Sequence, residues 1–178
     1  STGFIGERVC KNISKKIDLY TISKKNNMSF SKKHFLINTE KFYQLNKVIS
    51  NLKKKYEKIN VFFLAGESSV ENSLRNPNQS IQRSIQCLLN VLDSSRNLNT
   101  KLLFASSGSI YDSRTNHHLN EDSPIMPPSP YAAIKASSED ILNSFAESFN
   151  LDIKIVRIFS VYGQNMNRFF IHDLVKKI

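Results

Sequence analysis

The sequence predicts an α/β protein with a doubly wound, mostly parallel sheet flanked by helices. Short apolar runs of strand length alternate with longer segments of helical period, and glycines follow several of the predicted strand ends. The strands are expected at Asp18–Ile22, His34–Ile37, Val61–Ala65, Leu102–Ser106 and Ile153–Phe159. The helices are expected at Phe4–Ser14, Glu40–Glu57, Asn78–Arg96, Pro130–Phe149 and from Arg168 to the end.

The glycines mark the junctions between these elements. Gly3 and Gly6 open the first helix, Gly66 and Gly108 follow the third and fourth strands, and Gly163 closes the fifth. In a doubly wound fold, ligands bind beyond the carboxyl ends of the strands, at the switch in strand order. We therefore expect these glycines to converge on one crevice.

The later helices and loops differ in what they should contact. The Glu40–Glu57 helix is rich in lysine and should keep a solvated face. Tyr111–Ser129 carries three prolines among polar residues, which predicts a surface loop at the rim of a site. In the Pro130–Phe149 helix, apolar residues recur at helical intervals and should face the sheet. They are Ile134, Ile141, Leu142, Phe145 and Phe149.

Composition limits the class of protein. A chain of 178 residues with 40% hydrophobic residues can bury one core without disulfides, so residues 1–178 are expected to form one domain. Cys10 and Cys87 lack metal-ligand spacing, so no metal site is expected, and their low number suits a reducing, cytoplasmic compartment. The net charge of +10 comes with no aromatic stacking platform and no long apolar run. Nucleic-acid binding and membrane insertion are therefore not expected.

Tyr131 and Lys135 form the most informative pair in the chain. They stand four residues apart at the start of a predicted helix, and Ser107 lies 24 residues upstream at a strand end. Lowering a phenol pKa from near 10 to near 7 needs about 4 kcal/mol. An ammonium about 4 Å away, at an effective dielectric near 20, supplies about that much. Tyr131 could therefore act as an acid and base at neutral pH.

The same four-residue spacing occurs twice more, at Tyr20/Lys24 and Tyr43/Lys47. Tyr20 falls in a predicted strand, where residues four apart are well separated. Tyr43 falls in the lysine-rich helix, where a solvated face is expected. Pro130 distinguishes the third match, because proline suits the first position of a helix.

Ser1–Gly6 matches the last six positions of the phosphate-binding pattern Gly-x-x-Gly-x-x-Gly. The first glycine and its preceding strand are expected before position 1. Free amides at a helix start attract a pyrophosphate, and glycine lets the backbone approach it. The candidate residues are Thr2, Gly3, Phe4, Ile5 and Gly6; a glycine-rich helix cap is the structural alternative.

A second cofactor signal follows the next predicted strand. An acidic residue there usually binds the adenosine ribose of NAD. This chain has Ser23, Lys24 and Lys25 instead. We therefore hypothesise NADP over NAD, with Lys24 or Lys25 on the 2′-phosphate and Ser23 donating a hydrogen bond. Two solvated lysines are the alternative.

Five motifs occur in a recognisable order: Thr2–Gly6, Phe63–Gly66, Ser106–Tyr111, Ser129–Lys135 and Arg157–Gly163. With them the chain resembles the extended short-chain dehydrogenase/reductase superfamily, in its nucleotide-sugar epimerase, dehydratase and reductase branch. The resemblance implies a truncated dinucleotide-binding Rossmann domain over residues 1–178. It also implies that the first strand and most of the C-terminal substrate domain lie outside these residues.

The resemblance further implies roles for individual residues. Tyr131 would exchange a proton with a sugar hydroxyl or keto group, Ser107 would bind the same oxygen, and Lys135 would lower the pKa of Tyr131. Tyr131 and Lys135 would also contact the cofactor. The remaining cofactor contacts would come from Leu64, Ala65, Gly66, Phe159 and Ser160.

The implied function is an NAD(P)-dependent epimerase or 4-keto reductase of a nucleotide sugar, used in polysaccharide precursor synthesis. Dehydratases of this branch usually have Thr-Asp-Glu where this chain has Ser107–Ser109, so dehydration is disfavoured. A reductase of another carbonyl substrate and a non-catalytic dinucleotide-binding protein remain alternatives. A homodimer is implied, formed by the helices at Asn78–Arg96 and Pro130–Phe149.

Overall fold

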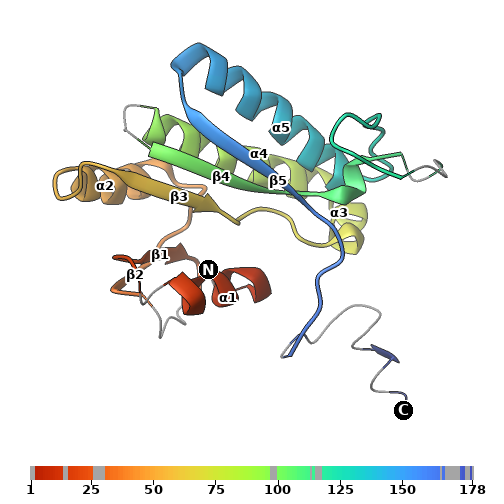
Figure 1. Cartoon of the computed structure of the whole chain (residues 1–178), viewed down its shortest axis with the longest axis horizontal. Coiled ribbons are helices and arrows are strands. Elements are labelled where there is room, and N and C mark those ends of the chain that lie inside the picture. Colours follow the sequence, from red (N-terminus) through yellow and green to blue (C-terminus); the bar gives the residue numbers. More distant parts are fainter. Residues whose placement is uncertain are drawn as a thin grey trace.

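The computed structural model describes residues 3–13, 16–25, 31–96, 100–112, 114, 118–164, 166, 173–174 and 177. In chain order the elements are α1 (Phe4–Ile13), β1 (Tyr20–Ser23), β2 (Lys33–Leu36), α2 (Phe42–Lys53), β3 (Ile59–Phe63), α3 (Val70–Arg75), α4 (Pro77–Ser95), β4 (Thr100–Ser107), the 3₁₀ turn η1 (Gly108–Ile110), α5 (Pro130–Phe149) and β5 (Asp152–Ile158). Helices and parallel strands alternate (Figure 1), which confirms the α/β class.

The five strands pair in parallel within the described residues, and one isolated antiparallel bridge joins Tyr111 to Ile125. β3, β4 and β5 form one sheet, with Phe63 beside Phe104 and Phe104 beside Ile155. β1 and β2 form a second sheet, in which Ile22 lies beside Phe35. We expected one sheet lacking its first strand. Among the described residues no strand pairing joins the β1–β2 sheet to the β3–β5 sheet, and the strand expected before position 1 lies outside them.

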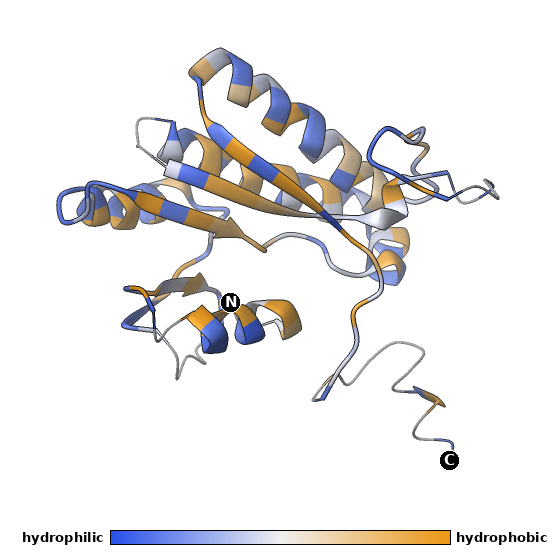
Figure 2. Ribbon diagram, in the orientation of Figure 1, coloured by the Kyte–Doolittle hydropathy of each residue, from blue (hydrophilic) through white to orange (hydrophobic). Residues whose placement is uncertain are grey.

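The main core lies between the β3–β5 sheet and the helices packed on it. α4 contacts both α2 and α5, so the three helices lie side by side. Apolar residues line the inner sides of the helices and strands (Figure 2). The fully buried side chains Leu92 of α4, Leu102 of β4 and Leu142 of α5 meet in this layer. Strand β4 is central in its sheet, and alternate residues along it are buried.

Several predicted boundaries were wrong by two or more residues. The second helix ends at Lys53 rather than Glu57. The third strand covers Ile59–Phe63 rather than Val61–Ala65, because the backbone leaves the ladder before Gly66. The short helix α3 was not expected at all. The helix predicted from Arg168 onward falls mostly outside the described residues.

Candidate functional site

A cavity of about 340 Å³ opens beyond the carboxyl ends of β1 and β3. Six of the predicted cofactor residues line it: Gly3, Ser23, Lys24, Leu64, Ala65 and Gly66. The opposite wall comes from α4, which the sequence did not indicate, through Ser80, Arg83, Ser84 and Cys87. The cavity therefore occupies the place where a doubly wound fold binds its ligand.

Gly66 turns the chain at the floor of this cavity. Its φ is +115°, a conformation that residues with a side chain rarely adopt. A Cβ would lie 3.7 Å from Ser84 Oγ, so space is available and the backbone conformation is what requires glycine. Directly after it, the Glu67 amide donates to Ser84 Oγ at 3.0 Å, which fixes the turn against α4.

Glu67 is a cavity residue that sequence reasoning missed. Its carboxylate accepts hydrogen bonds from the amides of Ser68 and Ser69 and from the side chains of Asn72 and Ser80. Burial alone would raise the pKa of Glu67, but these hydrogen bonds together hold the pKa below its usual value. Glu67 is thus an anion that organises the turn leading into α3.

Helix α3 in turn fixes the start of α5. Ser73, which is fully buried, accepts a hydrogen bond from the Tyr131 amide at 3.1 Å and donates to the Val70 carbonyl at 2.6 Å. Ser129 caps the start of α5, because its hydroxyl oxygen accepts a hydrogen bond from the Ala132 amide at 3.2 Å. The first amides of α5 would otherwise lack partners, and Ser73 supplies one from 58 residues away.

Lys135 is buried between α5 and β4, with 9% of its surface exposed. Its ammonium donates to the Ala105 carbonyl at 2.8 Å and lies 5.0 Å from the Phe104 ring centre and 5.9 Å from that of Tyr131. Burial lowers the pKa of Lys135 from 10.5 to about 8, against the opposing effect of nearby carboxylates. The structure therefore places a poorly solvated cation beside the Tyr131 ring.

Ser107 ends β4, next to the strand residues that hold Lys135. Its hydroxyl oxygen accepts from the Ser109 amide at 3.2 Å and lies 2.9 Å from the Ser109 hydroxyl. The neighbouring Gly108 leaves room for the Phe159 ring, which a Cβ would approach to 2.6 Å. η1 and α5 are in contact, so Ser107, Tyr131 and Lys135 come from packed elements.

A network of charged and polar side chains lies where α5, β4 and β5 meet. Glu139, one turn beyond Lys135, is 3% exposed and forms a double hydrogen-bonded ion pair with Arg157 of β5. It also accepts from the Ser106 hydroxyl, and Arg157 donates to the Tyr111 hydroxyl at 2.6 Å. The Glu139 pairing raises the pKa of Arg157 further. The network ties β4, β5 and α5 to the start of the 111–125 loop.

The remaining predicted residues lie elsewhere. Phe4, Ile5 and Gly6 belong to α1 but do not line the cavity. The predicted cofactor contacts Lys25, Tyr131, Lys135, Phe159 and Ser160 do not line it either. Phe159 is 59% exposed and stacks on Tyr111. Thr2 lies outside the described residues.

The predicted 2′-phosphate contacts are already engaged in the structure. Lys24 forms an ion pair with Glu40, and the Ser23 hydroxyl donates to the Lys25 carbonyl at 2.7 Å. Arg83 of α4 reaches the other oxygen of Glu40 at 4.0 Å. The sequence did not indicate Glu40, because its ion-pair partners, Lys24 after β1 and Arg83 on α4, are distant in the chain.

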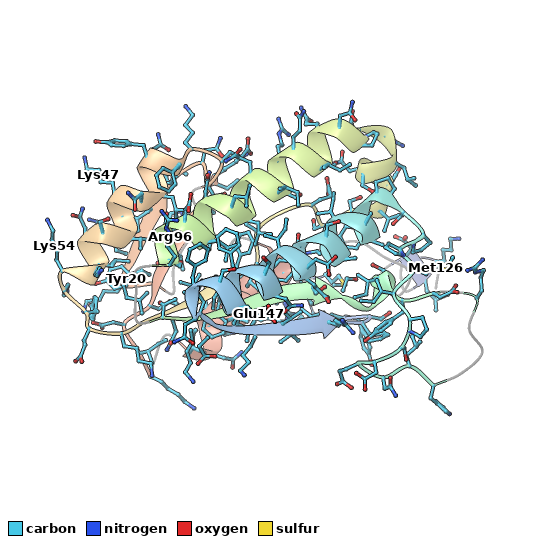
Figure 3. All side chains as sticks on the ribbon, turned by 90° about the horizontal axis from the view of Figure 1, so that it is seen from above. Tyr20, Lys47, Lys54, Arg96, Met126 and Glu147 are labelled. Atoms are coloured by element: carbon cyan, nitrogen blue, oxygen red, sulfur yellow. The ribbon has the colours of Figure 1, made fainter. Side chains whose placement is uncertain are left out.

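In the other two Tyr-x-x-x-Lys matches the lysine is not buried: Lys24 and Lys47 are exposed, whereas Lys135 is buried. Tyr43 is 77% exposed, and Lys47 projects outward from α2 (Figure 3). Tyr20 is the first residue of β1, and its hydroxyl lies 2.8 Å from that of Tyr56.

Two kinds of feature are absent from the described residues. No group of three or more histidine, cysteine, aspartate or glutamate side chains there could hold a metal ion. No described helix is both long and apolar enough to cross a membrane.

A doubly wound chain with its cavity at the strand ends has the architecture found in dinucleotide-binding proteins. Comparison with family models identifies the family within that class. The model of the NAD dependent epimerase/dehydratase family matches residues 1–178, and the chain belongs to this family.

Individual relatives are consistent with this assignment. Protein CapI of Staphylococcus aureus is 31% identical over 92% of this chain and 53% of its own length. A UDP-glucuronate 4-epimerase of Thermodesulfobacterium geofontis is 33% identical over 69% of this chain and 40% of its own length. The solved UDP-N-acetylglucosamine 4-epimerase of Methanobrevibacter ruminantium M1, in complex with UDP-N-acetylmuramic acid, is 30% identical with a TM-score of 0.78, covering 90% of this chain and 53% of that chain. The chain thus spans about half the length of these proteins.

The hydrogen bond from the Tyr131 amide to Ser73 predicts that two buried serines differ in their contribution to stability. Ser73→Ala should lower the free energy of unfolding by about 1–3 kcal/mol, because it leaves a buried amide without a partner. Ser95 is the matched control, since it is equally buried and its hydroxyl oxygen has no hydrogen-bond partner among the described residues. Ser95→Ala should be neutral or stabilising. Equal losses in urea denaturation would contradict the role of Ser73.

Lys135 predicts a pH dependence of stability in the unliganded protein. Its folded pKa of about 8 lies below the unfolded value near 10.4, so between these values the unfolded chain binds more protons. The free energy of unfolding should therefore rise with pH in this window, by up to about 3 kcal/mol. Below pH 8 this contribution is absent.

Denaturation at pH 7.5 and pH 10 measures this effect. The free energy of unfolding of the parent protein, relative to that of its Lys135→Met variant, should be higher at pH 10 than at pH 7.5. Lys47→Met, at an exposed position, should show no such change. A Lys135→Met difference that is the same at both pH values would count against a depressed pKa.

Proposed function

We propose that this chain is the cofactor-binding and proton-transferring part of an NAD-dependent 4-epimerase of a nucleotide-activated sugar. Family membership supports the dependence on NAD. Relatives of at least 30% identity carry the names UDP-glucuronate 4-epimerase and UDP-N-acetylglucosamine 4-epimerase, which supports the substrate class. We further propose that the product enters polysaccharide or glycan precursor synthesis.

The buried ammonium of Lys135 beside the Tyr131 ring is the observation that carries the proposal. An ammonium at this position would stabilise negative charge that develops near the Tyr131 oxygen during proton transfer. Tyr131 would take the proton of the sugar hydroxyl as its carbon is oxidised, and would return a proton to the keto oxygen on reduction. Ser107 would hydrogen-bond the same oxygen.

The residues that line the cavity support a dinucleotide as its ligand. Gly3 at the start of α1 and the turn at Gly66 leave backbone near the space where a pyrophosphate would lie. Ser23 and Lys24 would face the adenosine ribose, and Leu64 and Ala65 would contact the cofactor from the end of β3. The bound nicotinamide would supply hydride exchange at the sugar carbon.

The 4-keto reductase alternative uses the same residues but consumes one reduced cofactor for each product. Epimerisation leaves the cofactor unchanged overall. Incubating the protein, expressed with its natural flanking sequence, with NAD⁺ and UDP-glucose, UDP-glucuronic acid or UDP-N-acetylglucosamine distinguishes the two. Appearance of the 4-epimer without net NADH formation supports epimerisation.

Replacing the proposed acid and base provides the direct test. Tyr131→Phe should reduce kcat by at least about a hundredfold while NAD⁺ affinity stays within a few-fold, because the proton-transferring oxygen is lost and the ring remains. Tyr43→Phe is the matched control: Tyr43 also precedes a lysine by four residues but is 77% exposed, and its variant should retain full activity. Unchanged turnover in Tyr131→Phe would refute the assignment.

We also propose a homodimer formed through α4 and α5. Ile81 and Leu89, two turns apart on α4, and Phe149 on α5 each expose at least a third of their surface. Sedimentation equilibrium should give twice the mass of the chain. A paired Ile81→Glu and Leu89→Glu variant should shift the equilibrium to the monomer, while a monomeric parent protein would exclude this interface.

A cytoplasmic location is proposed on the basis of the thiols. Cys10 and Cys87 are both free and buried, and burial raises the pKa of each. Unpaired thiols are typical of reducing compartments.

A further inference from the structure

Glu40 occupies an unusual position at the cavity rim. Its carboxylate lies between two cations from different elements, Lys24 after β1 and Arg83 on α4. All three residues line the cavity. The position after β1 is where a doubly wound fold meets the 2′ group of the adenosine ribose. The two cations are therefore placed where a 2′-phosphate would need them.

The carboxylate is held more firmly than the cations. The segment before it is fixed to α4, because the Asn90 side chain donates to the Thr39 carbonyl at 2.9 Å and the Thr39 hydroxyl lies 3.1 Å from the Cys87 sulfur. The Glu40 amide also donates to the Asn38 side chain. The side chain of Glu40 is 24% exposed, whereas those of Lys24 and Arg83 are 51% and 56% exposed.

We propose that Glu40 is a specificity-determining residue that excludes NADP by occupying the cations that a 2′-phosphate would use. A 2′-phosphate entering this rim must displace the carboxylate from Lys24 and Arg83 and then lie close to it as a like charge. A free 2′-hydroxyl meets neither obstacle and can donate to a carboxylate. The lysines that indicated NADP from the sequence are therefore compatible with NAD selection.

This inference rests on the proposed function, since it requires a dinucleotide in this cavity. Calorimetric titration of the protein, with its natural flanking sequence, with NAD⁺ and NADP⁺ gives a readout independent of activity. The unchanged protein should bind NAD⁺ about tenfold or more tightly than NADP⁺. Glu40→Gln should raise the NADP⁺ to NAD⁺ affinity ratio by about tenfold or more, because it frees both cations.

Three further variants make the test specific. Glu40→Asp keeps the charge and should keep the preference for NAD⁺. Adding Lys24→Met to Glu40→Gln should remove most of the gained NADP⁺ affinity. Glu71→Gln is the matched control, because Glu71 also pairs with an arginine but is 73% exposed on α3 and does not line the cavity. Its ratio should not change.

The outcomes separate the two proposals. An unchanged ratio in Glu40→Gln, or a parent protein that binds NADP⁺ as well as NAD⁺, overturns the role of Glu40 alone. Failure of both dinucleotides to bind overturns the role of Glu40 together with the proposed function. A shifted ratio alongside full activity in Tyr131→Phe supports Glu40 and overturns the proposed chemistry.

Discussion

The ammonium of Lys135 is the group on which the arrangement of the site depends. A cation that is 91% removed from solvent is costly unless the fold supplies acceptors and opposite charge. The Ala105 carbonyl, the Phe104 and Tyr131 rings and the charge of Glu139 supply them. Tyr131 and Glu139 belong to α5 itself, but the contacts with Ala105 and Phe104 require α5 to lie on β4 in one register. The position of this cation beside Tyr131 therefore depends on the packing of α5 on the sheet.

A second line of contacts reaches the same tyrosine from the cavity. The Glu67 carboxylate binds the first turn of α3, and Ser73 of α3 binds the Tyr131 amide. Glu67 also contributes to the electrostatic environment of Lys135. The floor of the cavity and the first turn of α5 are therefore connected by hydrogen bonds through a helix of six residues. Movement of one should be resisted by the other.

Local sequence patterns were sufficient for the features whose physical cause is local. Strand and helix periodicity indicated the five parallel strands, and Pro130 marked the start of α5. The sequence could not indicate α3, because its six residues lack a helical repeat, and it stays in place through contacts with α4 and α5. Ser73 and Glu40 escaped detection for the same reason, since their partners are distant in the chain. The roles predicted for Tyr131 and Ser107 stay predictions.

The distribution of charge around the site is more informative than the net charge of the whole chain. The net charge of +10 gave no indication of the ligand. Around the site, however, three acidic side chains lie near positive charges: Glu40 between Lys24 and Arg83, Glu67 near Lys135, and Glu139 on Arg157. In the proposed binding mode, a 2′-phosphate would have to displace Glu40 from its two cations, whereas a free 2′-hydroxyl would not. Discrimination between the two dinucleotides would then depend on this local pairing rather than on the net charge of the chain.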